Sequence, residues 1–125
     1  AKEKGLTHDE TSIYRKLIDY EKAKGTTAVG CGIACPEACG IEISRPFAFI
    51  LCRTKNPVNF DPLDGKPIHI ILVSLIKDKA VPELLKAMAR IAGLLRKEDF
   101  RTAFLKAENE NEVLLLLRDN KRWNQ

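Results

Sequence analysis

Residues 67–76 read PIHIILVSLI, and this run decides the fold class of the chain. It is almost wholly apolar and rich in β-branched residues, with His69 near its start. Residues 47–53, FAFILCR, form a second run of the same kind. Runs of this length and composition are typical of β-strands that are buried on both faces. Such strands need covering layers on both sides, so we expect an α/β fold.

Residues 9–24 are predicted to form a helix ahead of these strands. Thr7 and Glu10 have the spacing of a capping box, in which each side chain bonds the backbone of the other residue. Apolar residues then recur at helical spacing, and Gly25 supplies a C-terminal stop.

Three more helices are predicted after the strand over residues 67–76. Pro82 suits the first position of a helix, residues 98–106 form a shorter one, and a third starts from Asn109. Asn109 and Glu112 repeat the cap spacing. The helix that begins at Pro82 is expected to bury one apolar face, made of Val81, Leu84, Leu85, Met88, Ile91, Ala92 and Leu95.

Small residues dominate residues 26–40. Glycines at positions 30, 32 and 40 disfavour a long helix and let the backbone approach another group closely. A short strand over residues 32–35, ended by Pro36, fits this stretch best. We expect a functional site to be built here, with Glu37 in an exposed glycine-rich loop.

Length and charge limit the classes of function. A chain of 125 residues is expected to form one domain, 1–125, and no apolar run is long enough to cross a bilayer. The 21 basic and 17 acidic residues are interspersed, which disfavours nucleic-acid binding. The polar start of the chain carries no secretory signal, so a cytoplasmic location is expected. No cofactor is expected.

Residues 25–38 read GTTAVGCGIACPEA, and they carry a family resemblance. They are similar, without a gap, to the segment GSTGIGNGIAIPHG of the IIA domains of the bacterial phosphoenolpyruvate-dependent sugar phosphotransferase system, of the fructose/mannitol and nitrogen-regulatory type. Pro46 and Phe47 match the start of a family strand, and residues 60–69, FDPLDGKPIH, match a family turn. The resemblance covers residue 9 to the end. It implies a mixed β-sheet sandwiched by helices, the fold shared with the cytoplasmic domain of anion exchangers.

The resemblance also implies that this copy of the site is inactive. The family's phosphate-accepting histidine corresponds to Glu37, and a second histidine, which orients the phosphoryl group, corresponds to Leu84. A basic residue two positions after the acceptor corresponds to Cys39. No catalytic residue is therefore expected. The strand and helix that open family members are not visible here, so we expect either an excerpt of a longer chain or a partner that supplies this edge.

Several residues near Glu37 are candidates for binding. Its carboxylate either imitates a phosphorylated state or marks a position relaxed after loss of activity. Ser44, Arg45, Thr27 and Cys39 could line an anion site, although an ordinary solvated loop is the simpler interpretation for Ser44 and Arg45.

The clustered cysteines form a separate candidate site. Cys31 and Cys35 would share one side with Glu37 in an extended strand, and Cys39 could close a cluster that binds a metal or responds to redox state. Cysteine as a small buried apolar residue is the simpler alternative.

The sequence leaves three functions open. The leading hypothesis is a regulatory or interaction module that does not accept phosphate and docks on a membrane transporter or a phosphotransferase component, or forms the soluble part of a membrane protein. The first alternative is an active phosphoryl carrier that uses Cys35 or Glu37. The second is a metal or redox sensor that uses Cys31, Cys35 and Cys39. A homodimer through an unpaired sheet edge is compatible with each.

Overall fold

The computed structural model describes residues 11, 14–19, 28–58, 67–119 and 123. It divides into two compact units, residues 1–81 and residues 82–125, and each is described by itself. The expectation of a single domain stays a prediction. Thr7, Glu10 and Gly25, with the caps predicted for the first helix, lie outside the described residues, while residues 14–19 of that helix are helical.

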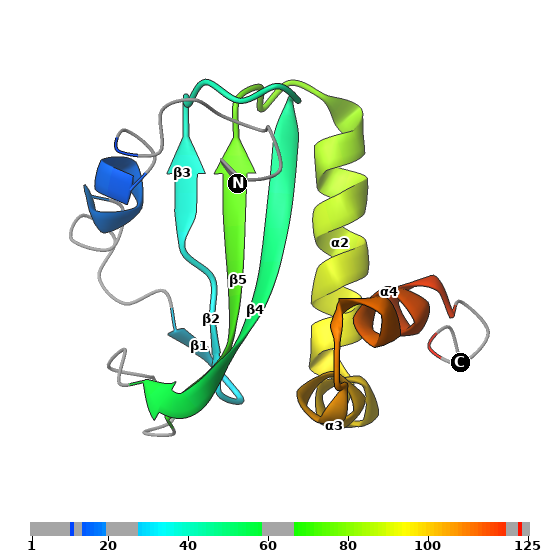
Figure 1. Ribbon diagram of the computed structural model, residues 1–125. Coiled ribbons are helices and arrows are strands. Elements are labelled where there is room, and N and C mark those ends of the chain that lie inside the picture. The colour runs from blue at the N-terminus through cyan, green and yellow to red at the C-terminus, as the bar shows by residue number, and fades with distance from the viewer. Residues whose placement is uncertain (1–10, 12–13, 20–27, 59–66, 120–122, 124–125) are drawn as a thin grey trace. The chain divides into compact units, whose positions relative to one another are not determined.

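The first unit is a mixed β-sheet (Figure 1). Its centre is β5, which pairs with β2 and β3 in parallel and with β4 in antiparallel orientation. β1 extends the sheet by pairing with β2 in antiparallel orientation. The strands are β1 (Ala28–Gly30), β2 (Ile33–Ala34), β3 (Glu37–Cys39), β4 (Phe47–Val58) and β5 (Ile68–Ile76). Both predicted apolar strands are confirmed, and β4 continues past residue 53.

β2 and β3 run along β5 in one register. Ile33 lies opposite Ile70 and Glu37 lies opposite Ser74, so both short strands keep the same offset from β5. Because side chains alternate along an extended chain, the odd-numbered residues of this line share one face of the sheet. Residues 34, 36 and 38 point to the other face, where all three are buried.

That other face holds a core cluster. Ala38 and Leu75 pack there with Ile41 and Ile43, and Leu17 of helical residues 14–19 packs against them. The short N-terminal helix therefore covers the face of the sheet opposite to Glu37. This packing leaves the odd-numbered residues of β3 to build the candidate site.

A tight turn replaces part of the strand predicted over residues 32–35. Cys31 and Gly32 both have positive φ, 56° and 75°, in the two-residue connection between β1 and β2. Two positive φ values are typical of a type I′ hairpin turn. The prediction was wrong at Gly32, because this residue turns the chain, and at Cys35, which follows β2.

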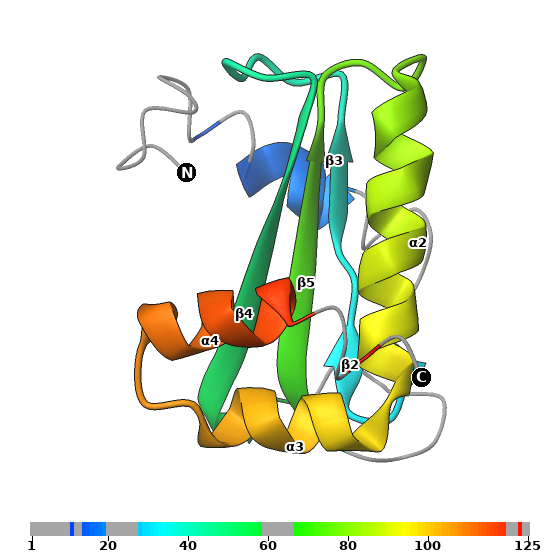
Figure 2. The same cartoon turned by 90° about the vertical axis from the view of Figure 1, so that its right-hand side faces the viewer.

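The second unit contains three helices: α2 (Pro82–Arg96), α3 (Glu98–Lys106) and α4 (Glu110–Arg118) (Figure 2). Trp123 lies against Phe100, with ring centroids 5.3 Å apart in a T-shaped arrangement, and its indole nitrogen donates to the Leu116 carbonyl at 2.7 Å. At the start of α4, the Asn109 side chain accepts from the Glu112 backbone N–H at 3.0 Å, which confirms the predicted cap.

The predicted apolar face of α2 was partly wrong. Leu84, Leu94 and Leu95 are the buried residues of this helix, whereas Leu85 is 73% exposed and Met88 is 38% exposed. Leu85 and Met88 therefore do not belong to the buried face of α2, although both are apolar. Among the described residues, no helix has the length and apolar content to cross a bilayer.

Candidate functional site

The candidate site is built on β3 around Glu37. Its carboxylate accepts a hydrogen bond from the Cys39 thiol, with 2.7 Å between Sγ and Oε1. The two residues share a face because they are two positions apart on one strand. The prediction of an exposed loop for Glu37 was wrong, since its backbone belongs to the parallel ladder with β5 and its side chain is half-buried. The ladder fixes the direction in which this carboxylate points.

The neighbouring strand contributes a buried hydroxyl group. Ser74 lies opposite Glu37, is 5% exposed, and its backbone N–H donates to the Pro36 carbonyl at 3.0 Å. Parallel strands carry their functional groups at their carboxyl ends, and β3 and β5 both end within two residues of this pair. Glu37, Cys39 and Ser74 therefore meet where this type of sheet places a site.

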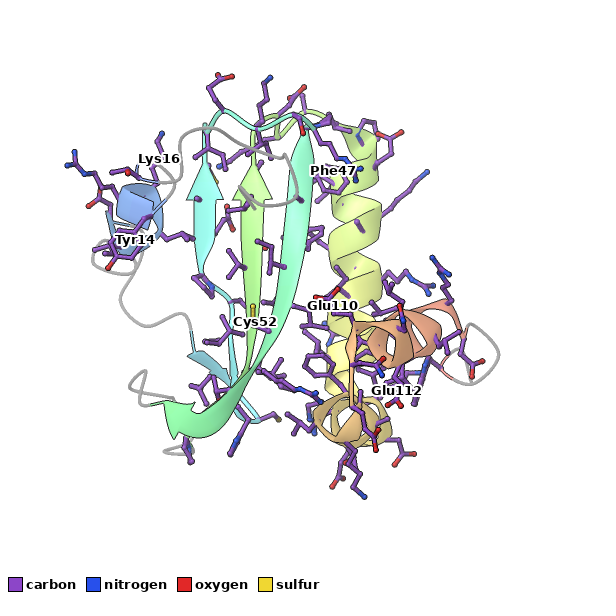
Figure 3. The ribbon with its side chains drawn as sticks, viewed as in Figure 1. Tyr14, Lys16, Phe47, Cys52, Glu110 and Glu112 are labelled. Carbon is purple, nitrogen blue, oxygen red and sulfur yellow. The ribbon has the colours of Figure 1, made fainter. Side chains whose placement is uncertain are left out.

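Two lysines bring positive charge to the same end of β3. The Lys16 ammonium donates to the carbonyls of Cys39 and Gly40, each at 3.2 Å (Figure 3). Lys79 follows β5 and interacts with the Cys39 thiol. Both lysines are exposed. Water screens the interactions of both ammonium groups at this end of the strand.

Two thiols on this line of residues, those of Cys35 and Cys39, have raised pKa values. Burial raises the pKa of the Cys39 thiol, the hydrogen bond to Glu37 and its negative charge raise it further, and the Lys79 ammonium lowers it. Burial also raises the pKa of Cys35. Because the thiolate is the nucleophilic form, both cysteines are weak nucleophiles near neutral pH.

The other candidate residues are exposed, outside the described residues or in the second unit. Ser44 and Arg45 are exposed in the connection before β4. Thr27 lies outside the described residues. Leu84 is buried in α2, which belongs to the second unit, so its position relative to Glu37 is not described. Of the predicted binding residues, the structure brings together Glu37 and Cys39.

The cysteines do not form the metal-binding cluster that the sequence left open as an alternative. No group of three His, Cys, Asp or Glu side chains that could hold a metal ion occurs among the described residues, which include Cys31, Cys35 and Cys39. Cys31 lies exposed in the hairpin turn. Cys35 and Cys39 are four residues apart on an extended line, about 13 Å at about 3.3 Å per residue, which is too far for a disulfide.

Three residues of the site were missing from the sequence-based prediction: Lys16, Ser74 and Lys79. Ser74 could have been found, because it is the one hydroxyl group inside the apolar run of residues 67–76. The two lysines are surface residues with no local signal. Only the folded chain brings Lys16 to the end of β3.

The mixed sheet and the helices of this chain define an α/β protein, with the Glu37 carboxylate at the carboxyl ends of its parallel strands. Residues 1–120 match the family model described as "Phosphoenolpyruvate-dependent sugar phosphotransferase system, EIIA 2". The chain belongs to this family.

Two relatives are a nitrogen regulatory protein and a component of a fructose-specific PTS system. The chain is 37% identical over 91 residues to a nitrogen regulatory protein of Bradyrhizobium diazoefficiens, covering 73% of this chain and 58% of that protein. It is 29% identical over 106 residues to the fructose-specific EIIABC component of Bacillus subtilis, covering 85% of this chain and 16% of that protein. The chain thus spans 58% and 16% of the lengths of these two relatives.

Solved structures are similar to this fold. The nitrogen regulatory protein IIA-Ntr of Neisseria meningitidis superposes with a TM-score of 0.75 at 28% identity, over 93% of this chain and 77% of that one. IIA mannitol of Escherichia coli gives a TM-score of 0.72 at 18% identity, over 93% and 79%. The predicted fold class, a mixed sheet with helices, is confirmed.

Proposed function

We propose that this chain is a IIA domain that does not accept phosphate and acts as a regulatory or protein-interaction module. The observation that supports the proposal is the hydrogen bond that the Cys39 thiol donates to the Glu37 carboxylate on β3 at 2.7 Å. By the resemblance of residues 25–38, Glu37 corresponds to the family's phosphate acceptor. A carboxylate repels an incoming phosphoryl group. It also lacks the imidazole nitrogen through which the family's chemistry proceeds.

The surroundings of Glu37 support the same proposal. Cys39 stands where a basic residue follows the acceptor in the family, and Leu84 stands at the position of the second histidine. Each charge-assisted hydrogen bond lost from an anion site weakens it by about 1.5–3 kcal/mol. Lys16 and Lys79 supply positive charge near β3, but the Lys16 ammonium already donates hydrogen bonds to two backbone carbonyls.

The alternative of an active phosphoryl carrier would need Cys35 or Glu37 as the acceptor. The raised pKa values of Cys35 and Cys39 count against a thiol acceptor, because the thiolate is the attacking species. A glutamyl acyl phosphate at Glu37 would have to replace the hydrogen bond from Cys39. The inert module is therefore the better proposal.

The partner proposed for the module is a phosphotransferase component or a membrane transporter, met in the cytoplasm. The fixed charge of Glu37 suits this role, because a carboxylate imitates part of the charge of a phosphorylated site and stays constant. A partner that binds the phosphorylated and unphosphorylated forms of a IIA domain differently would then always find a negative charge at this position. Glu37→Gln is expected to change the affinity for such a partner, whereas Glu42→Gln, an exposed carboxylate paired with Lys77, is expected to leave it unchanged.

The phosphorylation test uses the chain with phosphoenolpyruvate, enzyme I and the histidine phosphocarrier protein, followed by intact-protein mass spectrometry. We expect no phosphoryl adduct on this chain while the phosphocarrier protein in the same tube becomes phosphorylated. Glu37→His returns an imidazole and provides a matched comparison. A stoichiometric adduct on the unaltered chain would refute the proposal, and Cys35→Ser and Glu37→Gln would then identify the acceptor.

A further inference from the structure

Lys16 binds the backbone carbonyls at the end of β3. Its ammonium group donates to the Cys39 carbonyl and to the Gly40 carbonyl, each at 3.2 Å, from helical residues 14–19, which lie beside this strand (Figure 1). Gly40 has φ +64°, and an added Cβ there would lie 3.6 Å from the Lys16 Nζ. The ammonium group therefore contacts the chain where β3 ends and the backbone turns.

The strand pairing explains why β5 does not bind the Cys39 carbonyl. The Ser74 N–H donates to the Pro36 carbonyl at 3.0 Å, so the even-numbered residues of this line bond to β5. Successive carbonyls of a strand point to opposite sides, so the Cys39 carbonyl points away from β5. Cys39 is also the last residue of β3. The Lys16 ammonium thus holds a carbonyl that the ladder with β5 leaves unbound.

The next residue of the helix packs behind the same strand. Leu17 lies against the core cluster that contains Ala38. Ala38 separates Glu37 from Cys39 along the strand, and its side chain points to the face opposite to theirs. Consecutive residues of one helix, Lys16 and Leu17, therefore bind the end of β3 at its edge and pack against the core on one of its faces.

We propose that Lys16 is a positioning residue of the site: by binding the two carbonyls it fixes the end of β3, and this keeps the Cys39 thiol against the Glu37 carboxylate. The thiol and one of the two carbonyls belong to the same residue, so a backbone rotation at Cys39 that breaks its bond to Lys16 also displaces Sγ from Oε1, 2.7 Å away. The inference rests on the proposed function, because it takes this pair as the charged site that the module presents.

A positioning role and a purely electrostatic role have opposite effects on the thiol. The charged groups around Cys39 are the Glu37 carboxylate, the Lys79 ammonium and the Lys16 ammonium. If Lys16 acted only by its charge, its removal would destabilise the thiolate and raise the pKa of Cys39. If Lys16 positions the residue, its removal relaxes both the burial and the hydrogen bond to Glu37 that raise this pKa, so the pKa falls. The sign of the change separates the two roles.

The pH dependence of cysteine alkylation, followed at the peptide level on the 125-residue chain, tests the proposal. In Lys16→Met the rate at Cys39 should rise roughly threefold or more at pH 8, and the whole profile should move to lower pH, because the thiolate is the reacting species. Lys16→Arg keeps a cationic donor and should restore the unaltered profile. Arg15→Met removes the same charge from an exposed neighbour on the helix and should leave the rate at Cys39 unchanged.

Two other cysteines show whether the change is local. Exposed Cys31 and half-buried Cys35 should react in Lys16→Met at the rates of the unaltered chain. An unchanged or slower reaction at Cys39 would overturn the proposal. A rise of equal size at Cys35 would overturn it as well, because the whole sheet would then have loosened.

A double-mutant cycle with Glu37 tests how the effect reaches the thiol. If Lys16 acts by holding the thiol against the carboxylate, Lys16→Met should change the rate at Cys39 less in Glu37→Gln than in the unaltered chain. Equal effects in both backgrounds would contradict the assignment. A phosphoryl adduct would refute the inert module without altering the alkylation rates of the unphosphorylated protein, so the two proposals fail separately.

Discussion

Cys39 donates its thiol hydrogen to the carboxylate of Glu37 across one pleat of β3, with 2.7 Å between the two heavy atoms. The pair occupies positions i and i+2, so the strand itself creates the contact. Burial raises the pKa of the Cys39 thiol, and the same hydrogen bond, which orients the carboxylate, raises it further. The two groups present a carboxylate and a thiol of raised pKa, which is a weak nucleophile near neutral pH.

Removal of the charge on Glu37 should make Cys39 more reactive. In Glu37→Gln the repulsion between the carboxylate and the thiolate disappears, so the pKa of the Cys39 thiol should fall, although burial continues to raise it. The thiolate fraction below the pKa should therefore rise, and the alkylation rate should rise with it, because the thiolate is the reacting species. Alkylation at pH 8, followed at the peptide level, measures the rate.

Exposed Cys31 provides the internal reference for that experiment, because its alkylation rate should be the same in both proteins. Glu42→Gln removes an exposed carboxylate from the same unit and should leave the rate at Cys39 unchanged. An unaltered rate at Cys39 in Glu37→Gln would show that the carboxylate does not control this thiol.

Because burial raises thiol pKa values in the folded chain, its free energy of unfolding should fall as the pH becomes alkaline. Burial raises the pKa of Cys35 above its value in the unfolded chain, about 8.5. The unfolded chain therefore loses this proton first, and the stabilisation is fully present below about pH 8 and lost as the pH rises through the folded-state pKa. Urea unfolding at pH 7 and pH 9.5 should show a larger loss for the unaltered chain than for Cys35→Ala. Equal losses would contradict a perturbed thiol.

Two glycines should respond in opposite directions to the same substitution. Gly32 has φ +75°, and an added Cβ would lie 3.3 Å from the Pro67 carbonyl oxygen, so Gly32→Ala should cost about 1–3 kcal/mol. Gly93 lies inside α2, and a Cβ there would meet nothing within 4 Å. Gly93→Ala should stabilise the chain by about 0.5–1 kcal/mol. Urea unfolding of both variants measures the difference, and a stable Gly32→Ala would exclude the described turn.

The sequence predicted the strands and helices well because their patterns are local. The apolar runs of β4 and β5, the proline at the start of α2 and the cap at Asn109 each depend on residues close together in the chain. The turn at Cys31 was missed because cysteine is not a usual residue at positive φ, unlike asparagine in the common Asn-Gly turn. Its preference is overridden by the pairing of β1 with β2.

The candidate site was predicted only in part. The resemblance placed Glu37 and Cys39, but period-two alternation alone could not show that β2 and β3 share one line along β5. That register depends on contacts between residues 37 positions apart, as between Glu37 and Ser74. In this register Glu37 lies on a face of the sheet, whereas Cys31 lies in the turn between β1 and β2. Lys16 reaches Gly40 over a sequence separation of 24, for which no local pattern exists.

The cap of α4 gives a direct test of the second unit. Asn109 accepts from the Glu112 N–H at 3.0 Å, and Glu112 in turn accepts from the Glu108 N–H at 2.7 Å. Asn109→Ala leaves a helix N–H without its partner and should destabilise the unit by about 1 kcal/mol. Asn109→Asp keeps an acceptor and adds a negative charge at the positive end of the helix dipole, so its stability should match or exceed that of the unaltered chain.

Asn109→Gly separates the side-chain bond from backbone preference, because glycine is tolerated at this position and should cost only a few tenths of a kcal/mol relative to asparagine. The order of stability expected from urea unfolding is therefore asparagine and aspartate together, then glycine, then alanine. Asn109 is exposed, so packing contributes little to this order. If alanine equalled asparagine, the hydrogen bond to Glu112 would not stabilise α4, and tertiary contacts such as that of Trp123 with the Leu116 carbonyl would have to hold this helix instead.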